Sequence, residues 1–257
     1  MPILAWTPAA DQSAGDLLHT IGLVGGGLFA ALLLFLILRA LVQQPRYRVT
    51  RSFGADDLQA VKQALVAAEK RTVGEIVPVI VERSDPHPGP SWFSALCMML
   101  AGSWLLGRWL PWDSPELLLP AQLGLGAAGY LLARLLPGFK RAFIREERAT
   151  AVAEEQAFQE FYRNGLHKTQ GATGVLIFVS LLERRVIVLA GEGIDSRVDD
   201  RFWDGVDAAV LAGIRSGSLR AGLVAGIAMV GEKLSQTFPW VEGDRNEIPD
   251  RVVMRRE

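Results

Sequence analysis

Two long apolar segments interrupt a sequence that otherwise has the pattern of a soluble α/β domain. They are Trp92–Leu110 and Leu117–Leu136, each about 20 residues long and free of acidic residues. A helix of that length crosses the roughly 30 Å hydrocarbon core of a bilayer. A third apolar segment, Ile21–Val42, precedes the α/β pattern. We therefore expect three transmembrane helices at 21–42, 92–110 and 117–136, of which the last two form a hairpin inserted in the domain.

The basic residues beside these segments predict their orientation, because Lys and Arg in short flanking segments stay on the cytoplasmic side of a membrane. Residues 1–20 contain neither, whereas basic residues closely follow the first and third segments: Arg46, Arg48, Arg51, Lys140, Arg141, Arg145 and Arg148. We expect an integral protein of the cytoplasmic (inner) membrane, with residues 1–20 outside and the α/β domain and C-terminus in the cytoplasm. A cleaved signal peptide is the alternative for the first segment, but its start would be basic and its apolar core shorter.

Charge and cysteine content exclude two classes of site. The formal net charge is −1, and no basic stripe extends beyond the clusters beside the apolar segments, which argues against a nucleic-acid partner. The single cysteine, Cys97, lies inside an apolar segment. An internal disulfide and a thiolate metal cluster are therefore both excluded, and a reducing cytoplasm fits this composition.

Without the hairpin, residues 53–85 and 139–239 read as one α/β unit, followed by a C-terminal tail at 240–257. A helix is predicted near the start of the unit, because apolar residues recur there at spacings of three and four: Leu58, Val61, Leu65 and Ala68. The β-branched run Glu75–Glu82 predicts a strand, which a proline-rich loop ends. This first strand leads directly into the inserted hairpin.

The second half of the unit contains two further predicted strands. Gly174–Leu181 and Arg185–Ala190 are separated by three residues, so they can pair only as an antiparallel hairpin. Three helices are expected in this half. The first covers about 140–163, the second begins at a capping pattern formed by Ser196 and Asp199, and the third begins near Ser218. The predicted fold class is α/β, with a small mixed sheet covered by about four helices in addition to the three transmembrane helices.

Four short motifs resemble a known family in their order and spacing. They are Thr72-Val73-Gly74-Glu75-Ile76, the run from Thr169 to Ile177, Gly191-Glu192-Gly193-Ile194-Asp195, and Asn246-Glu247-Ile248-Pro249-Asp250. Together they resemble the TPM domain, and in particular a branch with membrane spans inserted after the first strand. The resemblance implies a membrane-associated protein and carries a phosphatase label.

One edge of the predicted sheet is a candidate metal site. If the first two strands run parallel, then the start of the first strand at Glu75 and the end of the third strand, next to Glu192 and Asp195, share an edge. Carboxylates beside a glycine turn suit a hard divalent cation such as Ca²⁺ or Mg²⁺. The alternative is structural, with Glu75 an exposed strand end and Asp195 or Ser196 a helix cap.

The remaining motifs have simpler explanations. The pattern Gly124-x-Gly126-x-x-Gly129 lies inside an apolar segment, where small residues let helices approach closely, so we expect no nucleotide cofactor. The three histidines fall in separate segments. His87, beside Asp85, could contact a metal or could be a polar loop residue between two prolines.

Two functions are compatible with these features. The first is a membrane-anchored cytoplasmic domain that acts as an interaction or assembly factor, with membrane lipid and other membrane proteins as partners. The second is a divalent-metal-dependent phosphatase, with Glu75, Glu192 and Asp195 as ligands or acids. Whether the chain is an enzyme stays open at this point. Lipid-surface sensing by the juxtamembrane basic residues is a third interpretation, although topology already explains those residues.

Overall fold

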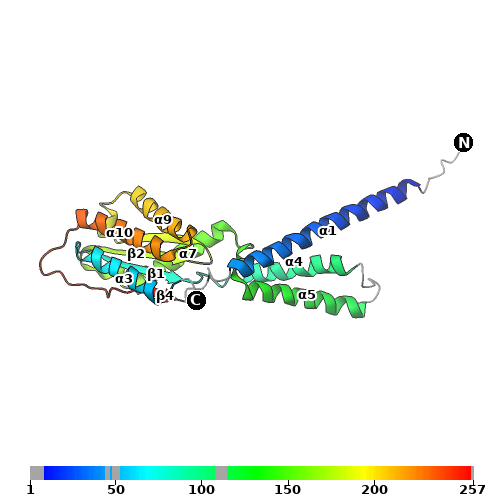
Figure 1. Cartoon of the computed structure of the whole chain (residues 1–257), viewed down its shortest axis with the longest axis horizontal. Helices are drawn as coiled ribbons and strands as arrows, with labels where there is room; N and C mark the ends of the chain where they lie inside the picture. Colours follow the sequence, from blue (N-terminus) through cyan, green and yellow to red (C-terminus); the bar gives the residue numbers. More distant parts are fainter. Residues whose placement is uncertain (1–8, 44–46, 48–52, 108–114, 256–257) are drawn as a thin grey trace. The chain divides into compact units, whose positions relative to one another are not determined.

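A computed structural model describes residues 9–43, 47, 53–107 and 115–255. The chain divides into two compact units (Figure 1). The helical unit comprises Met1–Val42 and Pro88–Phe143, and the α/β unit comprises Gln43–His87 and Ile144–Glu257. The helical unit is thus inserted between two parts of the α/β unit, as the position of the apolar hairpin in the sequence indicates.

The helical unit is built from α1 (Ala9–Gln43), α4 (Pro88–Leu106), α5 (Pro115–Leu135) and the short α6 (Pro137–Arg141). Small residues bring α4 and α5 together: the Ser94 hydroxyl donates a hydrogen bond of 2.9 Å to the Gly129 carbonyl oxygen. A Cβ atom at Gly129 would lie only 2.7 Å from that part of α4. Gly129 therefore has the helix-packing role expected for it, whereas Gly124 faces open space.

The length and composition of these helices support the membrane prediction only in part. Among the described residues, one helix, Glu116–Leu135, is long and apolar enough to cross a membrane, and Gly27–Gln43 is a shorter apolar helix. The end of the predicted span at 92–110 falls outside the described residues. One or two apolar helices are therefore found, and three transmembrane helices are not confirmed.

The α/β unit contains a mixed four-stranded sheet with the order β3-β2-β1-β4. β1 (Glu75–Val81) and β2 (Gly174–Ser180) pair in parallel from Glu75↔Gly174 to Val81↔Ser180. β3 (Arg185–Ala190) is antiparallel to β2, as the short connection between them predicts. The fourth strand, β4 (Val253–Arg255), comes from the segment interpreted as a tail and pairs with β1 in parallel.

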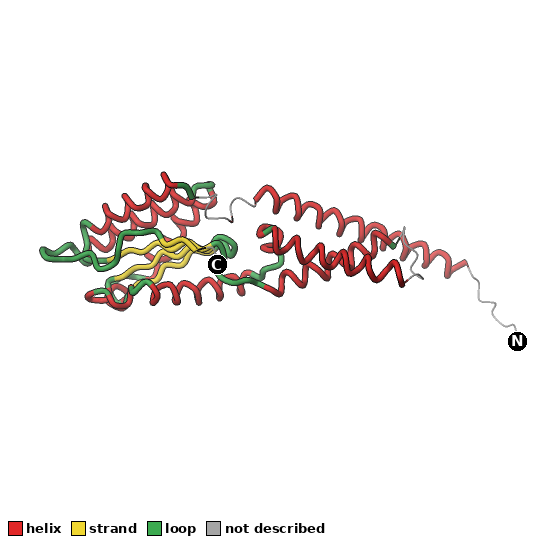
Figure 2. Tube along the Cα trace, turned by 90° about the horizontal axis from the view of Figure 1, so that it is seen from below, coloured by secondary structure: helices red, strands yellow, loops and turns green. Residues whose placement is uncertain are grey.

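Helices cover both faces of the sheet, as Figure 2 shows for the strands in yellow. α3 (Ala55–Glu69), α9 (Asp200–Arg215) and α10 (Leu219–Thr237) build one core, and α7 (Glu146–Arg163) builds the other. The alternation of side chains along β1 explains this division, because Ile76 and Ile80 enter the first core while Val77, Val79 and Val81 enter the second. A strand buried on both faces reads as a continuous apolar run, which matches β1 and β2.

Three short helical turns complete the unit and shape its edges. They are η2 (Leu166–Lys168), η3 (Gln170–Ala172) and α8 (Glu192–Asp195). Gly193 is required where the last two meet, because a Cβ atom there would lie 1.9 Å from the Gly171 carbonyl oxygen. The glycines of the Gly191-Glu192-Gly193 motif therefore serve close backbone packing beside the start of β2.

Candidate functional site

The structure places the three predicted metal ligands at the same edge of the sheet but in different surroundings. β1 begins at Glu75, and β3 ends at Ala190, two residues before Glu192. Glu75 is only 6% exposed, whereas Glu192 and Asp195 are exposed on α8. No hydrogen bond or ion pair between described residues joins the three, and the described residues contain no group of three His, Cys, Asp or Glu side chains arranged to hold a metal. The metal site stays a prediction.

The helix cap expected at Ser196 is wrong by three residues. α9 begins at Asp200, and Asp199 is its N-cap, with a side-chain oxygen that accepts a hydrogen bond of 2.8 Å from the Arg201 amide. Ser196 instead ends the short turn α8, and its hydroxyl points back to Gly193. Asp199 therefore performs the helix-capping role that was expected of Ser196, because an aspartate side chain accepts hydrogen bonds from helix amides as well as a serine does.

Glu75 lies in a different cluster from the predicted one. Its Oε1 atom accepts a hydrogen bond of 2.8 Å from the amide of Glu247, in the last motif of the sequence. Glu69 Oε1 accepts one of 3.0 Å from the Ile76 amide. Glu75 Oε2 is buried without a hydrogen-bond partner among the described residues. With Asp250 nearby, Glu69 and Glu75 form what we call the acidic edge cluster, which holds the C-terminal segment over the start of β1.

Burial controls the ionisation of this cluster. It raises the pKa of Glu69 from its ordinary value of 4.5 to about 9, and the neighbouring carboxylates of Asp250 and Glu75 act in the same direction. Burial also raises the pKa of Glu75, although hydrogen bonds from the Glu247 and Ile248 amides oppose this. Glu69 is therefore protonated at neutral pH, which spares the cluster one buried negative charge.

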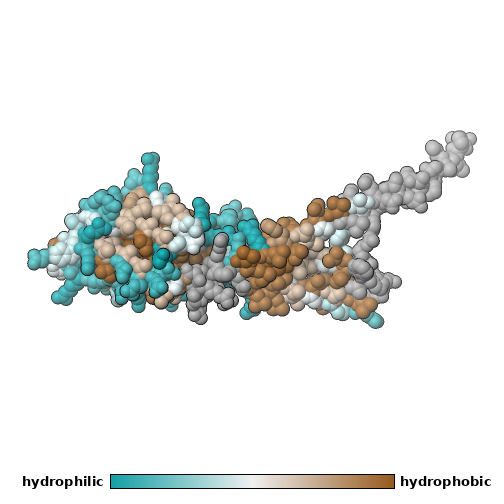
Figure 3. All heavy atoms as spheres, in the orientation of Figure 1, coloured by the Kyte–Doolittle hydropathy of each residue, from teal (hydrophilic) through white to brown (hydrophobic). Residues whose placement is uncertain are grey.

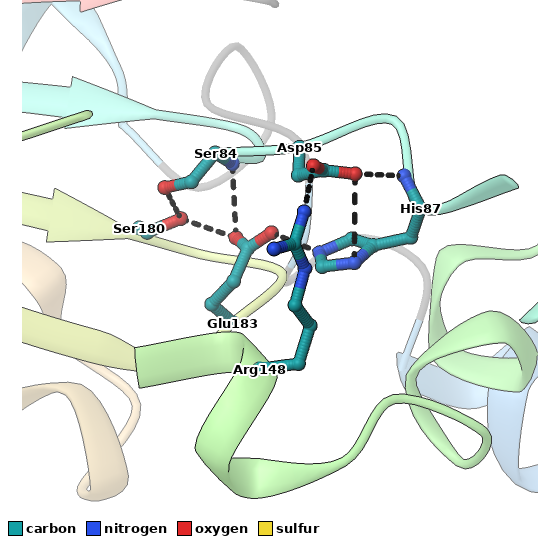
Figure 4. Close-up of polar contacts among 6 residues, drawn as sticks. All are labelled: Ser84, Asp85, His87, Arg148, Ser180 and Glu183. Atoms are coloured by element: carbon teal, nitrogen blue, oxygen red, sulfur yellow. Dashed lines mark hydrogen bonds and ion pairs between the residues drawn. The ribbon is translucent and has the colours of Figure 1, made fainter. Parts of the chain in front are cut away.

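The opposite edge of the sheet carries a polar network at the carboxyl ends of the two parallel strands (Figure 4). Ser84, Asp85 and His87 follow β1, while Ser180 ends β2 and Glu183 lies in the turn before β3. The His87 Nε2 atom lies 2.6 Å from Glu183 Oε1. His87 is 3% exposed and Glu183 is fully buried. This is the edge at which open α/β sheets usually bind ligands.

Every oxygen of the Glu183 carboxylate in this network has a partner. The Ser84 amide donates a hydrogen bond of 3.1 Å to Glu183 Oε2, and the Ser180 hydroxyl donates a very short one to the same atom. Burial alone would raise the pKa of Glu183, but these bonds and the contact with His87 hold it below its usual value. Glu183 therefore stays ionised at neutral pH.

Asp85 anchors the outer side of the network. Its carboxylate accepts hydrogen bonds from the His87 amide and from Arg148 Nη2 on α7, the latter of 2.9 Å. Burial raises the pKa of Asp85, but His87 and Arg148 together outweigh it, so the net shift is downward. His87 has a φ of 46°, which a non-glycine residue adopts only when its surroundings hold it there.

The network does not have the connectivity of an activated nucleophile. Glu183 lies between His87 and Ser180, so within this network the imidazole faces the carboxylates of Glu183 and Asp85 and contacts neither serine hydroxyl (Figure 4). In a serine hydrolase the histidine stands between the serine and the acid. The arrangement instead clamps the Ser84–His87 segment, which is the last part of the α/β unit before α4 begins. We call it the His87–Glu183 clamp.

A small polar pocket of about 180 Å³ opens beside the clamp. Ser84 and Asp85 form one side of it, and Glu155, Gln156 and Gln159 of α7 form the other. Its lining is rich in acceptors, because it includes two carboxylates and two amides. The pocket shows that the carboxyl edge is accessible to solvent next to a rigid, charged network.

Sequence patterns missed this site. From the sequence alone, His87 is a metal contact or a polar loop residue, and Glu183 is one of the three residues that connect two predicted strands. The signal that points to both is topological: each follows one of two neighbouring parallel strands, whose carboxyl ends meet at one edge. The metal site predicted from the sequence lies instead at the amino edge.

Comparisons with known proteins support the resemblance noted from the motifs. Residues 142–233 match the family model described as the TPM domain. A solved structure, the NMR structure of the BA42 protein from the psychrophilic bacterium Bizionia argentinensis, has a TM-score of 0.51 and 20% sequence identity. That alignment covers 80% of this chain and 98% of BA42, and at such identity it shows a shared fold. No curated protein matches the chain. The resemblance to the TPM domain is confirmed.

The acidic edge cluster predicts a stability that falls with rising pH. The folded chain retains a proton on Glu69 that the unfolded chain releases. The free energy of unfolding is therefore unaffected by Glu69 below pH 4.5, falls as the pH rises from 4.5 to about 9, and is then constant. Glu69→Gln should therefore raise the free energy of unfolding at pH 8 by on the order of 1 kcal/mol or more, with little change at pH 4. Denaturant unfolding at both values measures this. The exposed Glu154→Gln serves as control, and an equal effect of both variants would refute the assignment.

The His87–Glu183 clamp predicts a large cost when one partner is removed. His87→Ala leaves the buried Glu183 carboxylate without its imidazole and should lower the free energy of unfolding by about 3–5 kcal/mol. The double variant with Glu183→Gln should recover part of that loss, because the uncompensated charge is gone. His167→Ala, at an exposed histidine, is the matched control. A His87→Ala variant as stable as the control would show that the pair contributes nothing.

Proposed function

We propose that this chain is a membrane-anchored TPM-like domain that acts as an interaction or assembly factor for other membrane proteins. The helical unit anchors it in the cytoplasmic membrane, residues 1–20 lie outside, and the α/β unit works in the cytoplasm. Membrane lipid and membrane proteins are its partners, and neither nucleic acid nor nucleotide is required.

The observation that carries this proposal is the exposed apolar surface of the helical unit. Large hydrophobic side chains stand exposed along α4 and α5, including Trp92 at 66%, Leu100 at 59%, Leu123 at 72% and Leu135 at 63%. This surface is the brown region of Figure 3. Apolar patches of this kind mark surfaces that contact lipid or other proteins. Large hydrophobic side chains on α1 are exposed as well, such as Leu28 at 68%.

The α/β unit supports a binding role in a different way. Its two sheet edges are held by polar clusters whose contacts are internal, and its described surface also presents large hydrophobic side chains. Phe158 and Tyr162 on α7 are 54% and 61% exposed, and Trp240 is 52% exposed. Aromatic residues of this kind are enriched at protein interfaces. A rigid domain with exposed aromatic residues suits docking.

A divalent-metal-dependent phosphatase is the second candidate. One observation favours it: Glu75 is almost completely buried, yet one of its carboxylate oxygens has no hydrogen-bond partner among the described residues. A Ca²⁺ or Mg²⁺ ion would satisfy such an oxygen. The phosphatase label of the resembling family points the same way, but that is an analogy at the level of the fold.

Co-purification separates the two candidates. The full chain with a C-terminal tag, extracted from membranes in a mild detergent, should retain one or more integral membrane proteins in stoichiometric amount. A matched sample of an unrelated tagged membrane protein controls for carry-over. Hydrolysis of p-nitrophenyl phosphate that needs Ca²⁺ or Mg²⁺ and is lost in Glu75→Gln, without any retained protein, would favour the phosphatase and contradict the assembly role.

The same membranes report the orientation. In inverted vesicles the C-terminal tag should be cleaved by added protease, because the basic residues beside the apolar segments retain this end in the cytoplasm. In right-side-out vesicles it should be protected. Cleavage only in the latter would overturn the proposed topology.

A further inference from the structure

The outward side of α3 forms a groove with an unusual combination of charge and apolar surface. The groove has a volume of about 580 Å³, and its lining includes Lys62, Val66, Ala67, Lys70 and Arg71. Residues 62, 66 and 70 are spaced by four, so they lie along one face of the helix. The apolar pair Val66 and Ala67 thus forms a floor between cationic ends.

The cations of this groove have no acidic partner among the described residues. Neither Lys62, Lys70 nor Arg71 takes part in a described ion pair, although all three are exposed. Another basic residue near α3 does: Arg220 Nε lies 3.5 Å from Asp57 Oδ1. The groove therefore presents three positive charges on a surface that could pair with negative ones.

An exposed tryptophan is held by its backbone beside the last residue of the groove. The Trp240 amide donates a hydrogen bond of 3.1 Å to the Arg71 carbonyl oxygen, and Pro239 forms an antiparallel bridge with Thr72. The side chains of Trp240 and Val241 are 52% and 60% exposed. Trp and Arg are the residues that most often dominate binding energy at interfaces. The backbone hydrogen bond joins Trp240 to Arg71 at the end of the groove, and we call the groove lining together with Trp240 the α3 groove.

We propose that the α3 groove docks a segment of a partner protein that carries carboxylates beside a large apolar side chain. This rests on the proposed role as an interaction factor and names the chemistry of its partner. Complementary charge steers such a segment to Lys62, Lys70 and Arg71. Its apolar residue packs on Trp240, because the exposed Glu242 nearby repels a carboxylate at that end. The docked segment therefore has a direction.

The position of the groove in the α/β unit favours a protein over the anchoring bilayer. Arg71 lies just before the start of β1, whereas the chain enters the apolar helix α4 beyond the far end of that strand. A seven-residue strand spans about 23 Å. The Arg71 end of the groove is thus remote, within this unit, from the point at which the chain leaves for its apolar helices.

Peptide binding to the full chain in neutral detergent micelles tests the proposal. The probe is a fluorescein-labelled peptide of alternating Glu and Leu, and its counterpart contains Lys and Leu. We expect the Glu–Leu peptide to bind, more weakly as salt is added. The triple change Lys62→Glu, Lys70→Glu and Arg71→Glu should weaken binding at least about tenfold, and Trp240→Ala should weaken it about tenfold.

A matched control reverses three exposed cations elsewhere and makes the same change in net charge: Arg145→Glu, Arg201→Glu and Arg215→Glu. Equal loss in this control, or binding of the Lys–Leu peptide, would overturn the proposal. The proposal would also be overturned if the Glu–Leu peptide does not bind and the chain instead binds phosphatidylglycerol vesicles, with that binding lost in the α3 groove variant but not in the control.

Co-purification with the same variants separates this proposal from the proposed function. If membrane proteins are retained by the wild-type chain and lost from the α3 groove variant, the groove is the docking surface. If both retain them equally, the assembly role stands and the α3 groove proposal is wrong. If the wild-type chain retains none while its groove still binds the Glu–Leu peptide, the assembly role fails and the peptide-binding surface remains.

Discussion

The parallel pairing of β1 with β2 is the interaction on which the rest of the structure depends. It joins seven residues on each side, from Glu75↔Gly174 to Val81↔Ser180, across about 100 positions of sequence. Parallel strands always need a long crossover. In this chain the crossover contains α4 and α5, which belong to a separate unit, and then α7, which packs on the sheet. One α/β unit is thus assembled from two pieces on either side of an apolar insertion. The entropic cost of closing so long a connection is offset by the burial of both strands on both faces of the sheet.

Parallel pairing also creates the two polar edges, and these solve the problem of buried carboxylates in opposite ways. At the carboxyl edge, Glu183 is surrounded by an imidazole, a hydroxyl and an amide, so its pKa is lowered and the charge is retained. At the amino edge, Glu69 is buried among other carboxylates, and burial above all raises its pKa to about 9, so that one charge is removed. Both outcomes follow from the same rule, because a buried charge is tolerated only where partners compensate for it. The contacts at the carboxyl edge hold the Ser84–His87 segment, which precedes α4, and those at the amino edge hold the C-terminal segment.

Much of the sheet could be predicted from local pattern, but the contacts between distant segments could not. The apolar runs at β1 and β2 and the short connection to β3 were sufficient to predict the central strands and their directions. β4 has only three residues and follows a polar stretch, so no periodicity distinguishes it from a tail. The edge location of Glu75, Glu192 and Asp195 followed from strand direction, yet the side chains that contact Glu75 come from Glu69 and the C-terminal motif. Likewise, His87 and Glu183 are 96 positions apart, and only the register of the parallel strands brings them within 2.6 Å. Helix length and composition gave weaker information, because the described helices include one or two candidates for membrane spans rather than three.

We expect β1 and β2 to build one self-sufficient α/β unit, whose folding requires the chain to return to the sheet but does not require the apolar helices. A direct test replaces Pro88–Pro137 with a flexible Gly/Ser linker, removes residues 1–42, and follows denaturant unfolding by circular dichroism. Such a linker behaves as a random coil that allows the ends to meet. We expect a soluble, monomeric protein that unfolds in a single cooperative transition, with amides of β1 and β2 protected from hydrogen exchange. A protein without a cooperative transition, or with β1 amides that exchange freely, would contradict it.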